Sequence, residues 1–251
     1  MSVVVVPADP PREGLVLPEL PETSPLSTRQ AADLYAAALK DVAVAVSESG
    51  GNLLVNYRPD DLLPDHHRVD ESAEAAVRAT VATALGDLDD VRFEKQVGST
   101  YSARIGNTVT HLLESEDPGA VLVVDPTAML AGRTVVDAAG MKSRTSEVVL
   151  GPAPGGRLHL AGFTEPVDFE DAFATAPLST VAERATAAGF GIDFVEFSPV
   201  VETGADLTTL VSVLRARLAA GRAVPDNTTE VVEALDLRVV DGTVSAGTEG
   251  T

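Results

Sequence analysis

The chain has 251 residues, no cysteine, and 38 acidic against 18 basic residues, which gives a formal net charge of -20. This length suits one α/β domain with a large core. The lack of cysteine excludes disulfides, thiolate catalysis and zinc–thiolate sites. The charge excludes nucleic acid and an anionic membrane surface as partners.

Composition also indicates the surroundings in which the protein works. The acidic residues are scattered rather than gathered in one block. We therefore interpret them as a charged shell that salt screens, which is typical of a halophilic protein. No apolar run is long enough to cross a bilayer, and no basic segment precedes the first apolar run. We expect a soluble, cytoplasmic protein.

In the first half of the chain, apolar β-branched runs alternate with stretches of helical periodicity. Strands are predicted at residues 2–6, 52–57, 91–95 and 120–124, and helices at residues 70–85, 101–113, 128–139 and from Ser27 onward. Ser27, with Thr28 beside it, is the predicted cap of its helix. Residues 7–25, rich in Pro and Glu, form a long loop after the first strand, and such loops often carry function.

The main feature of the second half is residues 148–163, VVLGPAPGGRLHLAGF, which read as a strand, a Gly- and Pro-rich turn and a second strand. A ligand can approach the backbone of such a turn closely, although ordinary connections have the same composition. A helix at 179–188 capped by Ser179 or Thr180, a strand at 191–197 and a helix at 204–220 follow. The end of the chain predicts a helix at 228–235, a strand at 237–240 and a disordered tail.

Strands that alternate with helices predict an α/β fold: a Rossmann-like, mainly parallel sheet with helices on both faces. We assign residues 1–222 to this domain and residues 223–251 to a partly disordered C-terminal extension. Ligands of such sheets bind outside the carboxyl ends of the strands. That rule selects the residues that follow the strands, namely Arg12, Gln96, Asp125, the pair Gly155–Gly156 and Glu202.

The selected side chains suit a site for phosphate and metal. Asp125 can hold Mg²⁺ or Mn²⁺ through oxygen with Glu202 as second ligand; the alternatives are a helix cap at Asp125 and a solvated loop acid at Glu202. Arg12 can clamp a phosphate. Arg104 can reach a phosphate or a base, or form a surface ion pair. The Gly-x-Ser-x-Gly, Gly-x-Gly-x-x-Gly and Gly-x-x-x-x-Gly-Lys motifs are absent.

The order of these pieces resembles the GT-A-type, glycosyltransferase-like family of unknown function. The turn segment VVLGPAPGGRLHLAGF is similar to the family's valine–leucine–glycine–proline–alanine segment, acidic–glycine–glycine turn and tyrosine-rich strand. Gln96, Gly98 and Arg104 match its glutamine–glycine–arginine–methionine segment. APLST, VLVVDPT and ETGADL are similar to its proline–tryptophan–serine–threonine segment, its central strand and its late acidic segment.

This resemblance implies a nucleotide-diphospho-sugar transferase fold and metal-assisted transfer from a nucleotide or nucleotide sugar. It implies Asp125 and Glu202 as catalytic and metal residues, and Arg12, Gln96, Gly98, Arg104, Gly155 and Gly156 as residues that bind the nucleotide. The chain departs from the family where the phosphate segment keeps only Arg12, and where Pro154 and Gly155 replace the acid of the turn. Two hypotheses follow, a nucleotide-dependent transferase and a non-catalytic binding module that keeps the fold.

Overall fold

The computed structural model describes residues 2–247 and contains a seven-stranded sheet in the order β3-β2-β1-β4-β6-β5-β7. The strands are β1 (Ser2–Ala8), β2 (Asn52–Tyr57), β3 (Arg92–Lys95), β4 (Ala120–Val124), β5 (Val148–Pro152), β6 (Leu158–Phe163) and β7 (Ile192–Phe194). Strand β6 runs antiparallel to β4 and β5, and the other pairs are parallel. The predicted mainly parallel sheet is confirmed.

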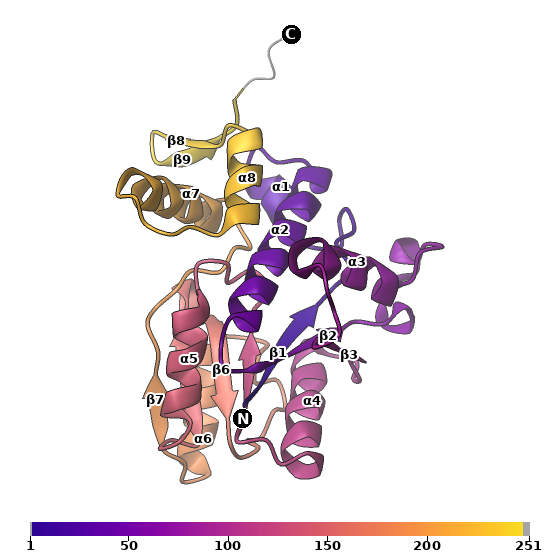
Figure 1. Ribbon diagram of the computed structural model, residues 1–251, viewed down its shortest axis with the longest axis vertical. Helices are drawn as coiled ribbons and strands as arrows, with labels where there is room; N and C mark the ends of the chain where they lie inside the picture. Colours follow the sequence, from indigo (N-terminus) through magenta and orange to yellow (C-terminus); the bar gives the residue numbers. More distant parts are fainter. Residues whose placement is uncertain (1, 248–251) are drawn as a thin grey trace.

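Helices cover both faces of this sheet (Figure 1). They are α1 (Leu20–Thr23), α2 (Thr28–Ser47), α3 (Ala73–Leu85), α4 (Tyr101–Ser115), α5 (Arg133–Lys142), α6 (Pro177–Ala187), α7 (Gly204–Ala219) and α8 (Asp226–Ala234), with short 3₁₀ turns η1 (Asp60–Leu62), η2 (Asp65–His67) and η3 (Pro154–Gly156). Helices α2, α3 and α5 pack with one face of the sheet, and α4 and α6 pack with the other.

Strand β1 lies near the middle of the sheet, and its apolar side chains alternate between the two layers of the core. Val4 and Val6 belong to the core beneath α2, while Val3 and Val5 face the core beneath α4. A strand that is buried on both faces is typical of a parallel sheet with helices on each side. The predicted cap of α2 is confirmed, since the Ser27 hydroxyl accepts a hydrogen bond from the backbone of Gln30 in a capping box.

Four predicted helix starts differ from the structure: α3 begins at Ala73 rather than residue 70, α8 begins at Asp226 rather than residue 228, and α5 and α6 differ as follows. A helix was expected from residue 128, but α5 begins at Arg133, because the chain first makes a turn in which the Asp125 carboxylate accepts hydrogen bonds from Thr127. Asp125 therefore does not cap a helix. Helix α6 begins two residues before the expected Ser179, at a proline, whose fixed φ suits the first helical position.

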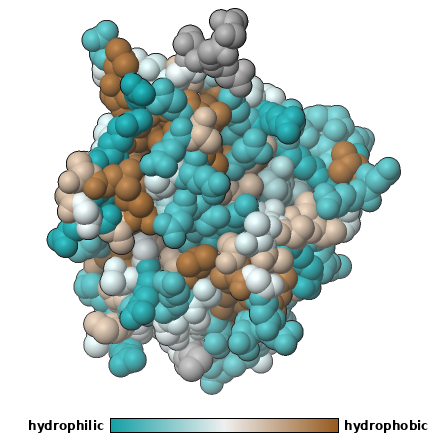
Figure 2. Space-filling model, turned by 45° about the horizontal axis from the view of Figure 1, so that its top comes forward, coloured by the Kyte–Doolittle hydropathy of each residue, from teal (hydrophilic) through white to brown (hydrophobic). Residues whose placement is uncertain are grey.

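The C-terminal segment folds against the rest of the chain. Helix α8 lies beside α2, where the Asp41 carboxylate accepts hydrogen bonds from the backbone of Asn227 and Thr228. Strand β8 (Arg238–Val240) pairs with β9 (Thr243–Ser245), which was not predicted, in a hairpin beside α7 (Figure 1). Figure 2 shows brown apolar side chains among teal polar ones in this part of the surface. The end of the predicted disordered tail, residues 248–251, lies outside the described residues.

Candidate ligand-binding cleft

A cleft opens where the strand order of the sheet reverses, between β1 and β4. The chain passes from β1 outward to β2 and β3, then returns to place β4 on the other side of β1. The connections that follow β1 and β4 therefore lead away from each other. Such a switch point leaves a crevice at the carboxyl ends of the strands. Asp9 follows β1 and Asp125 follows β4, and both line the cleft.

The cleft consists of two adjoining cavities, with volumes of about 380 Å³ and 230 Å³. Four side chains line both of them: Tyr101, Asp125, Phe173 and Glu202. The first cavity extends over β1, β3 and the loop that follows β1. The second extends over the turn between β5 and β6 and the start of α6.

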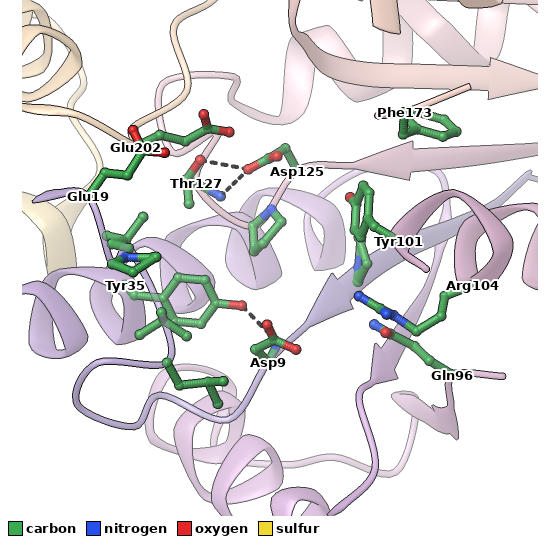
Figure 3. Close-up of a pocket in the computed structure, with 16 residues that line it drawn as sticks. Asp9, Glu19, Tyr35, Gln96, Tyr101, Arg104, Asp125, Thr127, Phe173 and Glu202 are labelled. Atoms are coloured by element: carbon green, nitrogen blue, oxygen red, sulfur yellow. Dashed lines mark hydrogen bonds between the residues drawn. The ribbon is translucent and has the colours of Figure 1, made fainter. Parts of the chain in front are cut away.

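The first cavity has an acid and a phenol on its floor. The Tyr35 hydroxyl accepts a hydrogen bond of 2.9 Å from the backbone N–H of Asp9, which leaves its own proton free for another acceptor (Figure 3). Burial raises the pKa of the Asp9 carboxyl, although Arg58 lies 3.7 Å from it and opposes the shift. Burial also raises the pKa of Tyr35 well above its ordinary value. Both groups therefore favour the protonated form more than they do in water.

Gln96 and Arg104 approach the same cavity side by side (Figure 3). The Gln96 amide donates to the carbonyl of Asn56 at 2.7 Å, while its Oε1 atom is buried with no partner. The Arg104 side chain is also buried, its Nε has no partner, and its guanidinium lies 5.7 Å from the ring centre of Tyr101. Burial lowers the pKa of this guanidinium. A buried polar atom without a partner is costly to the folded state, and both of these atoms belong to side chains that line the first cavity.

Asp125 lies at the junction of the two cavities. Its Oδ1 atom accepts hydrogen bonds from the backbone N–H and the hydroxyl of Thr127, at 2.7 and 2.6 Å (Figure 3). Burial raises its pKa to about 6, because desolvation outweighs these hydrogen bonds, and the charge of Glu202 adds to the rise. The carboxyl group is therefore poised to change protonation state close to neutral pH.

The second cavity is organised by Arg157, at the start of β6. Its Nε donates to the carbonyl of Pro154 at 2.8 Å, and both terminal nitrogens bind the Asp206 carboxylate in a fork. Its Nη1 also lies 3.0 Å from the Glu202 carboxylate. Although burial alone would raise it, hydrogen bonds from Arg157 and Thr203 lower the pKa of Asp206. These charged groups therefore satisfy one another.

The fold that surrounds this cleft also occurs in solved structures of other proteins. Over 94% of this chain and 95% of the other, the structure matches a protein from Desulfovibrio desulfuricans G20 assigned as a nucleotide-diphospho-sugar transferase, with a TM-score of 0.71 and 18% identity. The chain has the nucleotide-diphospho-sugar transferase fold. The 4-diphosphocytidyl-2C-methyl-D-erythritol synthase of Anaerococcus prevotii DSM 20548 matches 86% of this chain and 96% of its own, with a TM-score of 0.52 and 11% identity.

Neither protein-family profiles nor curated proteins match the sequence. The transferase fold is therefore established by the arrangement of the elements, because identities of this size carry no residue-level information. Among residues 2–247, no helix combines the length and the apolar character that a membrane crossing needs.

The transferase fold brings most of the predicted site residues together. Gln96, Arg104, Asp125 and Glu202 line the first cavity, and Gly155 lines the second together with Asp125 and Glu202. The remaining three lie outside both linings, and they are Arg12, Gly98 and Gly156. The Arg12 guanidinium donates to two backbone carbonyls of the segment before α3, at 2.6 Å each, and so fastens that segment to the loop after β1.

Sequence reasoning missed Asp9, Tyr35, Tyr101, Phe173 and Arg157 as cleft residues. Asp9 was within reach of the rule that selected residues after strands, but β1 continues through Pro7 to Ala8, two residues further than predicted. Arg157 directly follows the two glycines of the predicted Gly- and Pro-rich turn. No sequence signal identified the aromatic side chains, because their spacing equally suits a core.

A divalent cation is the cofactor that the transferase resemblance implies, with Asp125 and Glu202 as its ligands. One oxygen of Asp125 is used by Thr127, and Glu202 already has the Arg157 guanidinium as its cationic partner. Within residues 2–247, no group of three or more histidine, aspartate or glutamate side chains is suited to hold a metal. As they are arranged, these donors do not fit Mg²⁺ or Mn²⁺.

Proposed function

We propose that this chain binds a nucleotide or a nucleotide sugar in the cleft and transfers a nucleotidyl or glycosyl group from it. The observation that carries the proposal is the cavity at the switch point, with buried Gln96 Oε1 and Arg104 Nε facing no partner. The transferase fold supports it, and one structure of that fold belongs to a protein named for a diphosphocytidyl product.

In this proposal the base occupies the first cavity. An acceptor atom at Gln96 beside a donor at Arg104 complements the edge of a nucleobase, which presents donors next to acceptors. Tyr101 and Phe173 offer faces for stacking. The phosphates then extend past Asp125 to the junction, and the group to be transferred lies over the turn at Gly155. Transfer would depend on positioning and on charge neutralisation.

The first test is calorimetric titration with nucleoside triphosphates and nucleotide sugars in molar KCl. We expect Arg104→Met to weaken binding of whichever nucleotide binds by about 10- to 100-fold, because it removes a buried charged donor worth roughly 1.5–3 kcal/mol. Arg78→Met is the matched control, since Arg78 also lies over an aromatic ring, Phe93, at 4.0 Å but outside the cleft. Equal effects of both variants, or no binding by the folded wild-type protein, would contradict the proposal.

A second candidate function is binding without transfer. The observation that favours it is the ion pair of Glu202 with Arg157, which leaves the implied metal without its second carboxylate. A product assay separates the two candidates once a bound nucleotide is known. Turnover that Asp125→Asn abolishes supports the transferase, whereas binding without turnover over a panel of hydroxyl and phosphate acceptors supports the binding module.

A further inference from the structure

The Arg157 side chain, in the second cavity, is held through all three nitrogens of its guanidinium. Pro154 accepts from its Nε, and Asp206 accepts from both terminal nitrogens. Asp206 is itself held, because its Oδ2 atom also accepts from the backbone and hydroxyl of Thr203 at the start of α7. The guanidinium therefore cannot leave without breaking one hydrogen bond to the turn and two to a carboxylate that also caps a helix.

The two acids that contact Arg157 differ in exposure. The Asp206 side chain is 8% exposed and the Glu202 side chain 53% exposed. A buried, forked pair is costly to break, whereas a half-exposed pair contributes little. Glu202 can therefore move, but the positive charge next to it cannot. Any cation bound by Glu202 and Asp125 would lie close to a fixed guanidinium and be repelled by it.

The geometry points to Arg157 as a resident cation of the cleft. We propose that its guanidinium takes the place that a divalent metal would need beside Glu202, so that anionic ligands bind here without a metal. In the second cavity Arg157 is then the positive charge nearest to a phosphate or carboxylate group of the ligand. This inference rests on the proposed ligand site, but its first test needs no nucleotide.

That test is titration of the full chain with Mn²⁺ alone, in molar KCl so that the acidic surface is screened. We expect no saturable Mn²⁺ binding that Asp125→Asn removes. Arg157→Gln removes the charge but keeps a hydrogen-bonding group, and we expect it to create a Mn²⁺ site that the added Asp125→Asn change removes again. A purely structural role for Arg157 would lower stability without creating this site.

A second measurement covers the case in which Arg157→Gln does not fold. Pyrophosphate is titrated in the presence of EDTA into the wild-type protein and into Glu202→Gln. We expect binding in both and a several-fold higher affinity in Glu202→Gln, since one negative charge is removed and Arg157 loses a competing partner. Glu19→Gln is the matched control: Glu19 also lines the cleft, no ion pair joins it to Arg157, and it should change affinity less.

The outcomes separate this inference from the proposed function. A Mn²⁺ site in the wild-type protein that disappears in Asp125→Asn would overturn the inference and leave nucleotide binding possible. Loss of pyrophosphate binding with EDTA, weaker binding by Glu202→Gln, or a folded Arg157→Gln variant without a Mn²⁺ site would also overturn it. Failure of every nucleotide to bind, with the Mn²⁺ results as expected, would overturn the proposed function alone.

Discussion

The two cavities of the cleft differ in how their polar groups are satisfied. In the first, buried atoms of Gln96 and Arg104 have no partner, and burial raises the pKa of Asp9. In the second, His159 Nδ1 has no partner, but the charge of Arg157 is satisfied by Asp206, which lies behind the lining, binds Arg157 in a forked pair and has a lowered pKa. The charged group of the first cavity, Arg104, therefore has a buried nitrogen without a partner, whereas the charged group of the second, Arg157, is paired within the folded chain.

This contrast also explains why two buried carboxylates of one cleft shift in opposite directions. Burial penalises the charged form of both Asp125 and Asp206. The Arg157 guanidinium binds Asp206 directly, whereas it acts on Asp125 only from a distance, and there the hydrogen bonds from Thr127 and this charge do not outweigh desolvation and the negative charge of Glu202. The carboxylate that is paired within the fold, Asp206, therefore differs from the one whose pKa is close to neutral, Asp125.

The largest effect on stability is expected from breaking the ion pair of Arg157 with Asp206. Asp206→Ala leaves the Arg157 charge without its main partner and removes the acceptor for Thr203, so we expect the free energy of unfolding to fall by about 3–5 kcal/mol. Denaturant unfolding in molar KCl measures this. Asp206→Asn keeps an acceptor for Thr203 and should lose less stability.

The control for this variant is an exposed pair. Asp168 contacts Arg184 at the surface with its side chain 68% exposed, so Asp168→Ala should change stability little. If Asp206→Ala and Asp168→Ala lower the free energy of unfolding equally, the pair of Arg157 with Asp206 does not stabilise the fold in the way that we describe.

An increase in stability is expected from a change at Asp125, which lies at the junction of the two cavities. Its folded pKa of about 6 lies above its ordinary value of 3.8, so the folded state binds more protons than the unfolded state between these pH values. Stability from this group is fully present below about pH 4 and is lost as the pH rises to about 6. Asp125→Asn removes this loss, and we expect it to be more stable than wild type by about 1–3 kcal/mol at pH 7.5.

Unfolding of both proteins at pH 4, 5, 6 and 7.5 measures this difference, and the acidic surface that they share cancels in the comparison. The gain in stability should grow with pH up to about 6 and then stay constant. A difference that does not depend on pH would show that Asp125 is not desolvated in the folded state.

The sequence predicts those parts of the cleft that follow from local patterns of apolar residues. Strand β4 and its terminal Asp125 follow from one apolar run, and β2 follows from another, because burial on both faces of a sheet leaves a local mark. The order of elements then suffices to identify the fold. The switch-point rule finds Asp125 and Gln96 for the same reason, since each directly follows a strand.

The rest depends on contacts between segments far apart in the chain. Arg157 and Asp206 are 49 residues apart, and nothing local to either shows that they meet. The place of Arg12 in a long loop predicts a functional role, but the two carbonyls that its guanidinium binds lie more than 50 residues later. Asp125 was weighed as a helix cap, which the Thr127 turn rules out, because side-chain hydrogen bonds can compete with helix initiation.

The smallest effect concerns the turn between β5 and β6, which lines the second cavity. Gly155 has a φ of 71°, and a Cβ there would meet only Arg157 Nε, at 3.8 Å. Gly155→Ala therefore adds backbone strain without a clash, and we expect a loss of about 1 kcal/mol in the free energy of unfolding. Gly221→Ala is the matched control, because Gly221 has a φ of 61° with nothing within 4 Å and lies outside the cleft. Both variants should lose similar stability, but only Gly155→Ala should change ligand affinity, through the carbonyl of Pro154 that orients Arg157. Equal affinity in the two variants would mean that Arg157 keeps its position independently of the turn.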